Sequence, residues 1–202
     1  MSERIAIFGG TFNPPHLGHR RALVALIDRV KPDRVLVIPD GIPPHKELVG
    51  NASAEDRLAM TRLAFSDLCE VEISDMEMRR EGKSYTSDTL ASLTREGREL
   101  FLLVGGDMLL TLDRWHEFQT IFALATVCAL SRESDRESFA ALCAVAAGYE
   151  RDFGARIQMI DTDPFPISSS ELRARLARSQ EDLSGLMDER VIAYIKERGL
   201  YV

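Results

Sequence analysis

Short apolar runs alternate with segments of helical periodicity along most of the chain, and this alternation limits the fold more than any other feature. Strands are indicated by short β-branched or apolar runs, and amphipathic helices by apolar positions three and four apart. A chain that alternates the two forms a doubly wound parallel sheet with helices on its faces. We therefore predict an α/β, Rossmann-like fold in a single domain, 1–202, that ends in a helical segment at about 168–202.

The same pattern predicts where the strands and helices lie. The strands are expected at 5–8, 34–38, 70–73, 101–104, 126–130 and 157–160. The helices are expected at 16–30, 53–68, 86–94, 109–123 (in shorter pieces), 135–150, 168–177 and 188–198. The stretch 76–86 is expected to be irregular, with a short edge strand as the alternative. Ligands of such sheets bind beyond the carboxyl ends of the strands.

Charge, cysteine content and hydropathy exclude several classes of protein. The formal net charge of −7 argues against a non-specific nucleic-acid-binding protein, which normally has a basic surface. Small anionic substrates stay compatible with this charge, because only the field inside a cleft matters for them. Cys69, Cys128 and Cys143 lack CxxC spacing, so we expect reduced, buried thiols. The most apolar segment, 121–130, is too short to span a bilayer and no signal peptide is expected before the first strand, so we expect a cytoplasmic protein without a membrane partner.

The segment from Gly9 to His19 (Gly-Gly-Thr-Phe-Asn-Pro-Pro-His-Leu-Gly-His) lies at the first strand-to-helix junction, where α/β folds bind phosphates. On a helix that begins near His16, His16 and His19 share one face with the apolar positions that pack on the sheet. A tight turn with capping or surface histidines is the alternative. The coincidence of a glycine pair, a proline pair and two histidines favours a phosphate site. It is not the dinucleotide fingerprint, because Pro14 and Pro15 stand where that pattern needs glycine.

A second candidate phosphate site follows the last predicted strand, at 167–173 (Ile-Ser-Ser-Ser-Glu-Leu-Arg). The hydroxyls of Ser168, Ser169 and Ser170 lie at a helix start, beside backbone N–H groups that have no partner within the helix. Arg173 lies on the same helix face as Ser169. A plain N-cap is the alternative for the serines. The position after a strand, together with the arginine, favours an anion site.

Three further candidates follow predicted strand ends. Asp107, after Gly105 and Gly106, is placed to accept hydrogen bonds from ribose hydroxyls, with a helix N-cap as an equal alternative. Trp115 is a candidate for stacking on a flat ring, with a core position as the alternative. Lys46 lies in a loop stiffened by prolines, which favours a lysine held above the crevice over a solvated one.

The imidazoles of His16 and His19, Lys46, Arg173, the serine hydroxyls and the two helix starts all stabilise negative charge. No serine or cysteine stands beside an evident base, so covalent catalysis is not predicted. The set fits the transfer of a nucleotidyl group between phosphates, in which an enzyme aligns the reactants and neutralises charge on phosphorus and on the leaving pyrophosphate. Mg²⁺ is expected on the triphosphate, held by phosphate oxygens and water, and no residue is assigned as a metal ligand.

The two motifs resemble those of a known superfamily. Gly9–His19 is similar to the Gly-x-Phe-x-Pro-x-His-x-Gly-His signature of nucleotidyltransferases, and Ile167–Arg173 is similar to their Ile-Ser-Ser-Thr-x-x-Arg motif. Other segments resemble the bacterial nicotinate-nucleotide adenylyltransferase family, and the resemblance spans nearly the whole chain. These segments are Pro43–Lys46, Ser84–Leu90, Gly105–Asp107 with Trp115, and Tyr194–Tyr201.

This resemblance implies that the chain transfers AMP from ATP to nicotinate mononucleotide, giving deamido-NAD and pyrophosphate in NAD biosynthesis. His16, His19 and Arg173 would be catalytic, with His19 the stronger candidate for stabilising the transition state. The residues implied in ATP binding are Gly9, Thr11, Phe12, His16, His19, Asp107, Ser169, Ser170 and Arg173. The residues implied in binding the mononucleotide, through its phosphate or its ring, are Lys46, Thr86 and Trp115.

Some positions depart from the family pattern. Asn13 stands where Asp is frequent and Ser170 where Thr is usual, and both keep the capacity to form hydrogen bonds. His116 replaces the aromatic residue that often follows the tryptophan, and Arg132 lacks the Pro-Gly that often follows it in the family. No role is assigned to His116 or Arg132.

Three alternatives stay open. Another adenylyl- or cytidylyltransferase of the superfamily, such as the pantetheine-phosphate enzyme, is disfavoured by Lys46, Thr86 and Trp115. Nicotinamide mononucleotide as the preferred acceptor is a closer rival, because backbone N–H groups can recognise the nicotinate carboxylate. A regulatory nucleotide-binding protein without activity is disfavoured by the presence of both histidines and of Arg173. A homo-oligomer also stays open.

Overall fold

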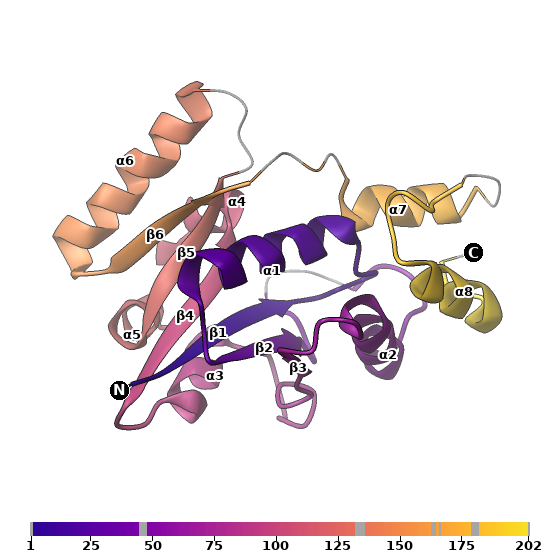
Figure 1. Ribbon diagram of the computed structural model, residues 1–202, viewed down its shortest axis with the longest axis horizontal. Coiled ribbons are helices and arrows are strands. Elements are labelled where there is room, and N and C mark those ends of the chain that lie inside the picture. Colours follow the sequence, from indigo (N-terminus) through magenta and orange to yellow (C-terminus); the bar gives the residue numbers. More distant parts are fainter. Residues whose placement is uncertain are drawn as a thin grey trace. The chain divides into compact units, whose positions relative to one another are not determined.

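A computed structural model describes residues 2–44, 48–131, 136–162, 165, 167–178 and 182–201. The strands are β1 (Glu3–Gly10), β2 (Arg34–Pro39), β3 (Val71–Ile73), β4 (Arg98–Gly105), β5 (Ala125–Ser131) and β6 (Arg156–Asp161). The helices are α1 (Leu17–Val30), α2 (Ala54–Phe65), α3 (Thr86–Leu93), α4 (Gly106–Leu109), the 3₁₀ turn η1 (Leu112–Arg114), α5 (Phe118–Leu124), α6 (Arg136–Phe153), α7 (Ser169–Leu176) and α8 (Glu189–Arg198). The predicted alternation is therefore confirmed (Figure 1).

The strands form a six-stranded sheet in the order β3-β2-β1-β4-β5-β6. β1 pairs with β4, β4 with β5, and β5 with β6, each pair in parallel. The chain thus starts inside the sheet and winds first toward one edge and then toward the other, which is the order of a doubly wound fold. The predicted Rossmann-like sheet is confirmed. The direction of winding reverses between β1 and β4, and the carboxyl ends at such a reversal are where this fold binds ligands.

The described residues fall into two compact units. Unit 1 is built from 1–9, 22–36 and 85–164, and unit 2 is built from 10–21, 37–84 and 165–202. The boundaries fall at the end of β1, within α1, within β2, just before α3, and between β6 and α7. The single domain expected at 1–202 stays a prediction.

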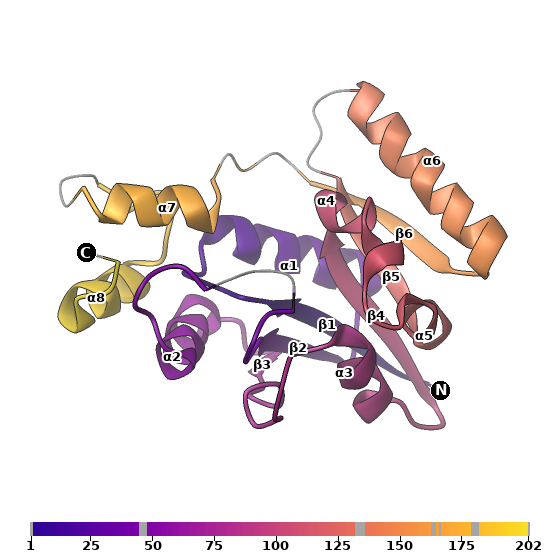
Figure 2. The same ribbon diagram turned by 180° about the vertical axis from the view of Figure 1, so that it is seen from behind.

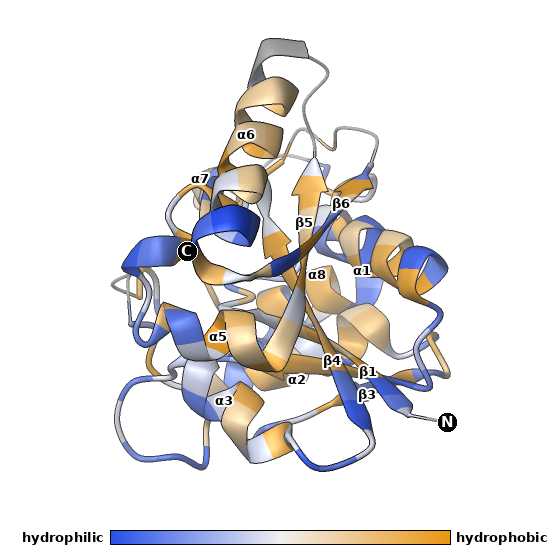
Figure 3. Ribbon diagram, turned by 90° about the vertical axis from the view of Figure 1, so that its left-hand side faces the viewer, coloured by the Kyte–Doolittle hydropathy of each residue, from blue (hydrophilic) through white to orange (hydrophobic). Residues whose placement is uncertain are grey.

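Unit 1 holds the apolar core of the central strands. Leu23 and Leu26 of α1 and Val127 of β5 have no exposed surface. α1 lies on one face of the sheet, and α3 and α5 lie on the other face (Figures 1 and 2). β5 is coloured as hydrophobic along much of its length in Figure 3, as expected for a strand covered on both faces. The apolar stripe predicted on α1 is therefore confirmed.

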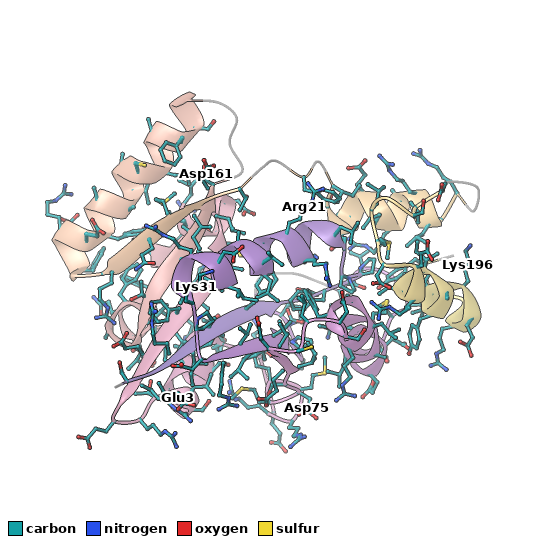
Figure 4. The ribbon with its side chains drawn as sticks, in the orientation of Figure 1. Glu3, Arg21, Lys31, Asp75, Asp161 and Lys196 are labelled. Carbon is teal, nitrogen blue, oxygen red and sulfur yellow. The ribbon has the colours of Figure 1, made fainter. Side chains whose placement is uncertain are left out.

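The amino-terminal ends of β1 and β4 are joined by an ionic cluster around Glu3 (Figure 4). The Glu3 carboxylate lies 2.8 Å from Nε of Arg98, 2.9 Å from Nη2 of Arg95 and 3.7 Å from Nη1 of Arg34. The hydrogen bond from Arg98 is the largest cause of the lowered pKa of Glu3. The cluster lies at the end of these strands opposite their carboxyl ends, and its exposed ion pairs contribute little to stability.

In unit 2, helices α2 and α8 lie beside each other (Figures 1 and 2). Ser53 and Asp56 form the predicted capping box, with Oγ of Ser53 3.1 Å from the Asp56 nitrogen and the Ser53 nitrogen 3.0 Å from Oδ2 of Asp56. Asp56 also accepts hydrogen bonds from the Tyr194 hydroxyl at 2.8 Å and from Nε of Arg198 at 3.3 Å. Burial raises the pKa of Asp56, but the hydrogen bonds from Ser53 and Tyr194 lower it below its ordinary value overall.

The prediction that all three cysteines are buried is wrong. Cys128 on β5 is buried, and burial raises the pKa of its thiol to about 12. Cys143 is half-buried and Cys69 is exposed. Cys69 lies in a turn beyond the end of α2 at Phe65, and its thiol is exposed there.

The stretch 76–86 contains turns and the start of α3, and the edge strand considered there is absent from it. The backbone N–H groups of Met78 and Arg79 donate to the carbonyl of Asp75, which closes a turn and prevents an extended backbone. In the described part of the chain, none of the helices is both long and apolar enough to cross a membrane.

Replacing Leu26 with alanine tests the packing of α1. We expect Leu26→Ala to lower the free energy of unfolding by about 2–5 kcal/mol, because the buried side chain leaves a cavity. Val24→Ala on the same helix is the control, since Val24 is 39% exposed, and its effect should stay within about 0.5 kcal/mol. Urea denaturation measures both, and equal losses would contradict the assigned buried face.

Candidate active site

The turn after β1 is shaped by Gly10 and Phe12. Phe12 has a φ of 47° and its side chain is only 2% exposed. Its ring lies over Gly10, where a Cβ atom would be 3.3 Å from the ring, so a side chain at position 10 would displace it. The ring also meets His19 edge-on, with centroids 5.1 Å apart. A buried apolar ring in this turn therefore supports one of the predicted catalytic residues.

His16 and His19 lie side by side at the start of α1, as predicted. Their ring centroids are 3.7 Å apart. The backbone N–H of His16 donates to Nδ1 of His19 at 3.1 Å. A neutral imidazole whose Nδ1 accepts a hydrogen bond carries its proton on Nε2. The fold therefore selects the tautomer in which His19 has an N–H donor on the far side of its ring.

Hydrogen bonds join the second motif to this turn. Oγ of Ser169 donates to the carbonyl of Pro14 at 2.9 Å, and Nη1 of Arg173 donates to the carbonyl of Asn13 at 2.7 Å. Nη2 of Arg173 also donates to Oγ of Ser170 at 3.1 Å. Unit 2 thus brings together the two motifs that the sequence singled out, although more than 100 residues separate them.

The serines at the start of α7 have different roles. Ser168 is the N-cap, and its Oγ accepts a hydrogen bond from the backbone N–H of Glu171 at 3.2 Å. The capping alternative therefore holds for Ser168. Ser169 and Ser170 instead fix the helix to the turn and orient Arg173. Two of the five N–H groups of that guanidinium are used in these contacts, and a guanidinium can donate the others to phosphate oxygens.

Sequence reasoning missed Arg57, which is fully buried in α2. Its Nη1 donates to the carbonyl of Thr11 at 2.9 Å and to Oδ1 of Asp40 at 2.8 Å, and its Nη2 donates to the carbonyl of Gly41 at 2.9 Å. Oδ2 of Asp40 in turn accepts a hydrogen bond from Oγ1 of Thr11 at 2.7 Å. Helical spacing was the available signal, because position 57 lies on the same face as the buried Met60.

Asn13 and Tyr201 were also missed as partners. The Tyr201 hydroxyl donates to Oδ1 of Asn13 at 2.6 Å, and Nδ2 of Asn13 donates to the carbonyl of Val49 at 2.9 Å. The expectation that Asn13 merely keeps the hydrogen-bonding capacity of an aspartate is incomplete, because an ionised carboxylate cannot donate to Val49. The sequence carried no signal for this contact, which joins positions 188 residues apart.

Gly9 and Asp107 belong to unit 1. Gly9 is the next-to-last residue of β1. Asp107 is exposed in the first turn of α4, and Oδ1 of its carboxylate lies 2.5 Å from where a Cβ at Gly105 would stand. The N-cap of α4 is Gly105 and no side chain caps it, so the capping alternative for Asp107 is wrong. A Cβ at Gly106 would lie 3.0 Å from the carbonyl of Leu130, so this glycine allows α4 to approach β5.

The predicted ring-binding residues lie in unit 1 beside a stacked pair. The rings of Tyr85 and His116 lie 4.1 Å apart at 30°. Thr86 follows Tyr85 as the first residue of α3, and Trp115 precedes His116. The stack therefore brings the segments of Thr86 and Trp115 together. Trp115 is half-buried instead of lying fully in the core. The ring of His116 packs on the ring of Tyr85.

Lys46 and Arg132 lie outside the described residues. Within the described ranges, no three His, Cys, Asp or Glu side chains gather as ligands of a metal ion.

Replacing Arg57 with methionine tests the anchor of the turn. Arg57→Met leaves the Asp40 carboxylate without its cation and the carbonyls of Thr11 and Gly41 without this donor, so we expect the free energy of unfolding to fall by about 3–5 kcal/mol. Arg57→Met combined with Asp40→Asn should recover part of this loss, because no buried charge remains. Arg62→Met, at an exposed position of the same helix, is the control. Identical denaturation curves for Arg57→Met and Arg62→Met would contradict the role of Arg57 as the anchor of the turn.

Comparisons with known proteins agree with this arrangement. The cytidylyltransferase-like family model matches residues 7–175. A probable nicotinate-nucleotide adenylyltransferase of Desulfatibacillum aliphaticivorans is 36% identical over 98% of this chain and 100% of the relative, and one of Geobacter metallireducens is 38% identical over 98% of each. The Plasmodium falciparum nicotinic acid mononucleotide adenylyltransferase complexed with NaAD has the same fold, with a TM-score of 0.78 at 18% identity over 98% of this chain and 97% of that one. The chain therefore belongs to the cytidylyltransferase-like family and, within it, to the nicotinate-nucleotide adenylyltransferases.

Proposed function

We propose that this protein transfers the adenylyl group of ATP to nicotinate mononucleotide, giving deamido-NAD and pyrophosphate. The observation that carries this proposal is that two adjacent imidazoles, those of His16 and His19, lie on the same turn that Arg173 contacts. Imidazole and guanidinium N–H groups on adjoining elements match the oxygens of a polyphosphate. Relatives of matching length that are named for this activity support it.

The reaction needs alignment and charge neutralisation more than a nucleophilic side chain. A phosphate oxygen of the mononucleotide forms a new bond to the α-phosphorus of ATP, while the bond to the bridging oxygen breaks and pyrophosphate leaves with its electron pair. Negative charge builds on the α-phosphoryl oxygens and on the leaving group. The Nε2–H of His19 is held to donate to such an oxygen, because its Nδ1 is fixed by His16. We assign Arg173, with Ser169 and Ser170, to the leaving phosphates.

For the remaining ATP contacts we assign the turn residues Gly9, Thr11 and Phe12, with Asp107 on the ribose. The carbonyl of Thr11 is fixed by Arg57, and the ring of Phe12 supports His19, so this turn is rigid before a ligand arrives. Rigid donors cost little reorganisation during the reaction.

The acceptor is assigned to Thr86 and Trp115 with Lys46. The half-buried indole of Trp115 offers a flat surface, and the Tyr85–His116 stack holds the segments that carry Trp115 and Thr86. Lys46 is kept in this proposal from the resemblance of its loop to the family.

Mg²⁺ is proposed to arrive with ATP. The groups that unit 2 gathers in the two motifs are imidazole, guanidinium and hydroxyl groups, which suit phosphate oxygens, whereas Mg²⁺ prefers carboxylates and water. When bound to the triphosphate, the ion would offset part of its charge. Because ATP is a cytoplasmic metabolite and Cys69, Cys128 and Cys143 are free thiols, we also propose the cytoplasm as the location.

Pyrophosphate release tests the activity. Purified protein is incubated with ATP, Mg²⁺ and either nicotinate or nicotinamide mononucleotide, with 4′-phosphopantetheine as the acceptor of the rival reaction. We expect the fastest release with nicotinate mononucleotide, a lower rate with nicotinamide mononucleotide, and loss of activity when EDTA removes Mg²⁺. Equal rates with the two mononucleotides would contradict the stated preference. Absence of release with every acceptor would contradict the enzyme itself.

Replacing His19 tests the mechanism. His19→Ala removes one donor to a developing charge, so we expect kcat to fall by at least about a hundredfold. Arg29→Ala, at an exposed position in the last turn of the same helix, is the matched control and should retain kcat. Thermal unfolding checks that both variants are folded. A His19→Ala enzyme within a few-fold of the wild-type kcat would remove this residue from the catalytic role.

A further inference from the structure

The carboxyl-terminal segment of unit 2 contacts the turn through Tyr201. The side chains of Tyr201 and Asn13 are 6% and 5% exposed, and 2.6 Å separates the hydroxyl from Oδ1. The carbonyl of Val49 can only accept, so the amide nitrogen of Asn13 must face it. Oδ1 of Asn13 therefore faces Tyr201, and the hydroxyl is the donor. Burial raises the pKa of Tyr201, which keeps this donor protonated at neutral pH.

Tyr201 is itself held on two sides. Its backbone N–H donates to Oδ1 of Asn51 at 2.8 Å, and Nδ2 of Asn51 donates to the carbonyl of Gly199 at 2.9 Å. Its ring lies against Gly50, where a Cβ atom would be 3.0 Å away. The hydroxyl is thus presented by a fixed ring instead of by a free chain end.

Both polar atoms of the Asn13 side-chain amide are held by hydrogen bonds, to Tyr201 and to Val49. These bonds fix the position of Asn13, whose backbone carbonyl accepts a hydrogen bond from Arg173. Nη1 of Arg173 is 2.7 Å from that carbonyl oxygen. A small rotation of Asn13 would move the oxygen and let the long arginine side chain leave its position. An arginine that is already oriented loses less side-chain entropy when it binds a phosphate.

We propose that Tyr201 is a positioning residue for ATP: through Asn13 it holds the Arg173 guanidinium in the orientation that binds the phosphates. This inference rests on the proposed function, because it takes ATP as the ligand of Arg173. It adds a role for a tyrosine hydroxyl that does not itself touch the substrate.

A double-mutant cycle on ATP affinity tests the proposal. Calorimetry measures the Kd of ATP with Mg²⁺, without a mononucleotide, for the wild-type protein, Tyr201→Phe, Arg173→Ala and the double variant. We expect Tyr201→Phe to raise the Kd by about fivefold, the scale of one lost hydrogen bond. In the Arg173→Ala background the same change should raise it by less than about twofold, because the residue through which it acts is gone.

Tyr194→Phe is the matched control. Tyr194 is also a tyrosine of the carboxyl-terminal segment, and its hydroxyl donates to Asp56 instead of Asn13. The Tyr194→Phe substitution should lower the melting temperature without changing the Kd of ATP. A Tyr201→Phe variant that behaves in the same way would overturn the proposal, as would an equal effect of Tyr201→Phe with and without Arg173. If Tyr201→Phe does not fold, Asn13→Ala takes its place in the cycle with the same expected coupling.

The failure of this inference and the failure of the proposed function give different results. A wild-type protein that binds ATP but releases no pyrophosphate with nicotinate mononucleotide would contradict the proposed function, and the coupling between Tyr201 and Arg173 would still be measured. An active enzyme without that coupling would contradict the role of Tyr201 alone. A wild-type protein that does not bind ATP would overturn both.

Discussion

The buried guanidinium of Arg57 is the interaction on which the turn after β1 depends. A fully buried charge is unfavourable unless it is paired and hydrogen-bonded, and Arg57 meets this condition with the Asp40 carboxylate and the carbonyls of Thr11 and Gly41. These acceptors lie directly after β1 and β2, so one side chain fixes the backbone beyond two strand ends. The turn that carries the histidines is therefore held from inside the fold.

A second set of polar contacts holds the same turn. Asn13 links Tyr201 and Arg173 to it, and Ser169 bonds to Pro14. The carboxyl-terminal helices thus stabilise a segment near the amino terminus. Side chains held in this way pay less entropy on binding and can stabilise developing charge without rearrangement. In the proposed reaction, this allows imidazole, guanidinium and hydroxyl groups to act without a nucleophile among them.

Much of the fold could be predicted because its signals are local. The alternation of apolar runs and helical segments predicted the sheet, and the spacing of His16 and His19 predicted that their rings lie side by side. Predictions about burial and hydrogen-bond partners were less accurate, because these depend on contacts between residues far apart in the sequence. The predicted burial of Cys69 was wrong because it rested on the residue type alone, and the fold places this cysteine in an exposed turn after α2. The expectation that Asn13 only replaces the hydrogen bonds of an aspartate was incomplete. Its side-chain N–H donates to the carbonyl of Val49, and the sequence does not reveal this partner.

The sequence by itself determined the strand–helix alternation, the imidazole, guanidinium and hydroxyl groups of the two motifs, and the family to which they belong, because each follows from residue types at short spacing. Only the tertiary structure decided which side chains hold those motifs. Arg57 looks like a surface charge in a helix, and Tyr201 looks like an ordinary residue near the chain end. Their roles arise from contacts with Thr11 and Asn13, dozens to nearly two hundred residues away, and such contacts form only when the chain folds.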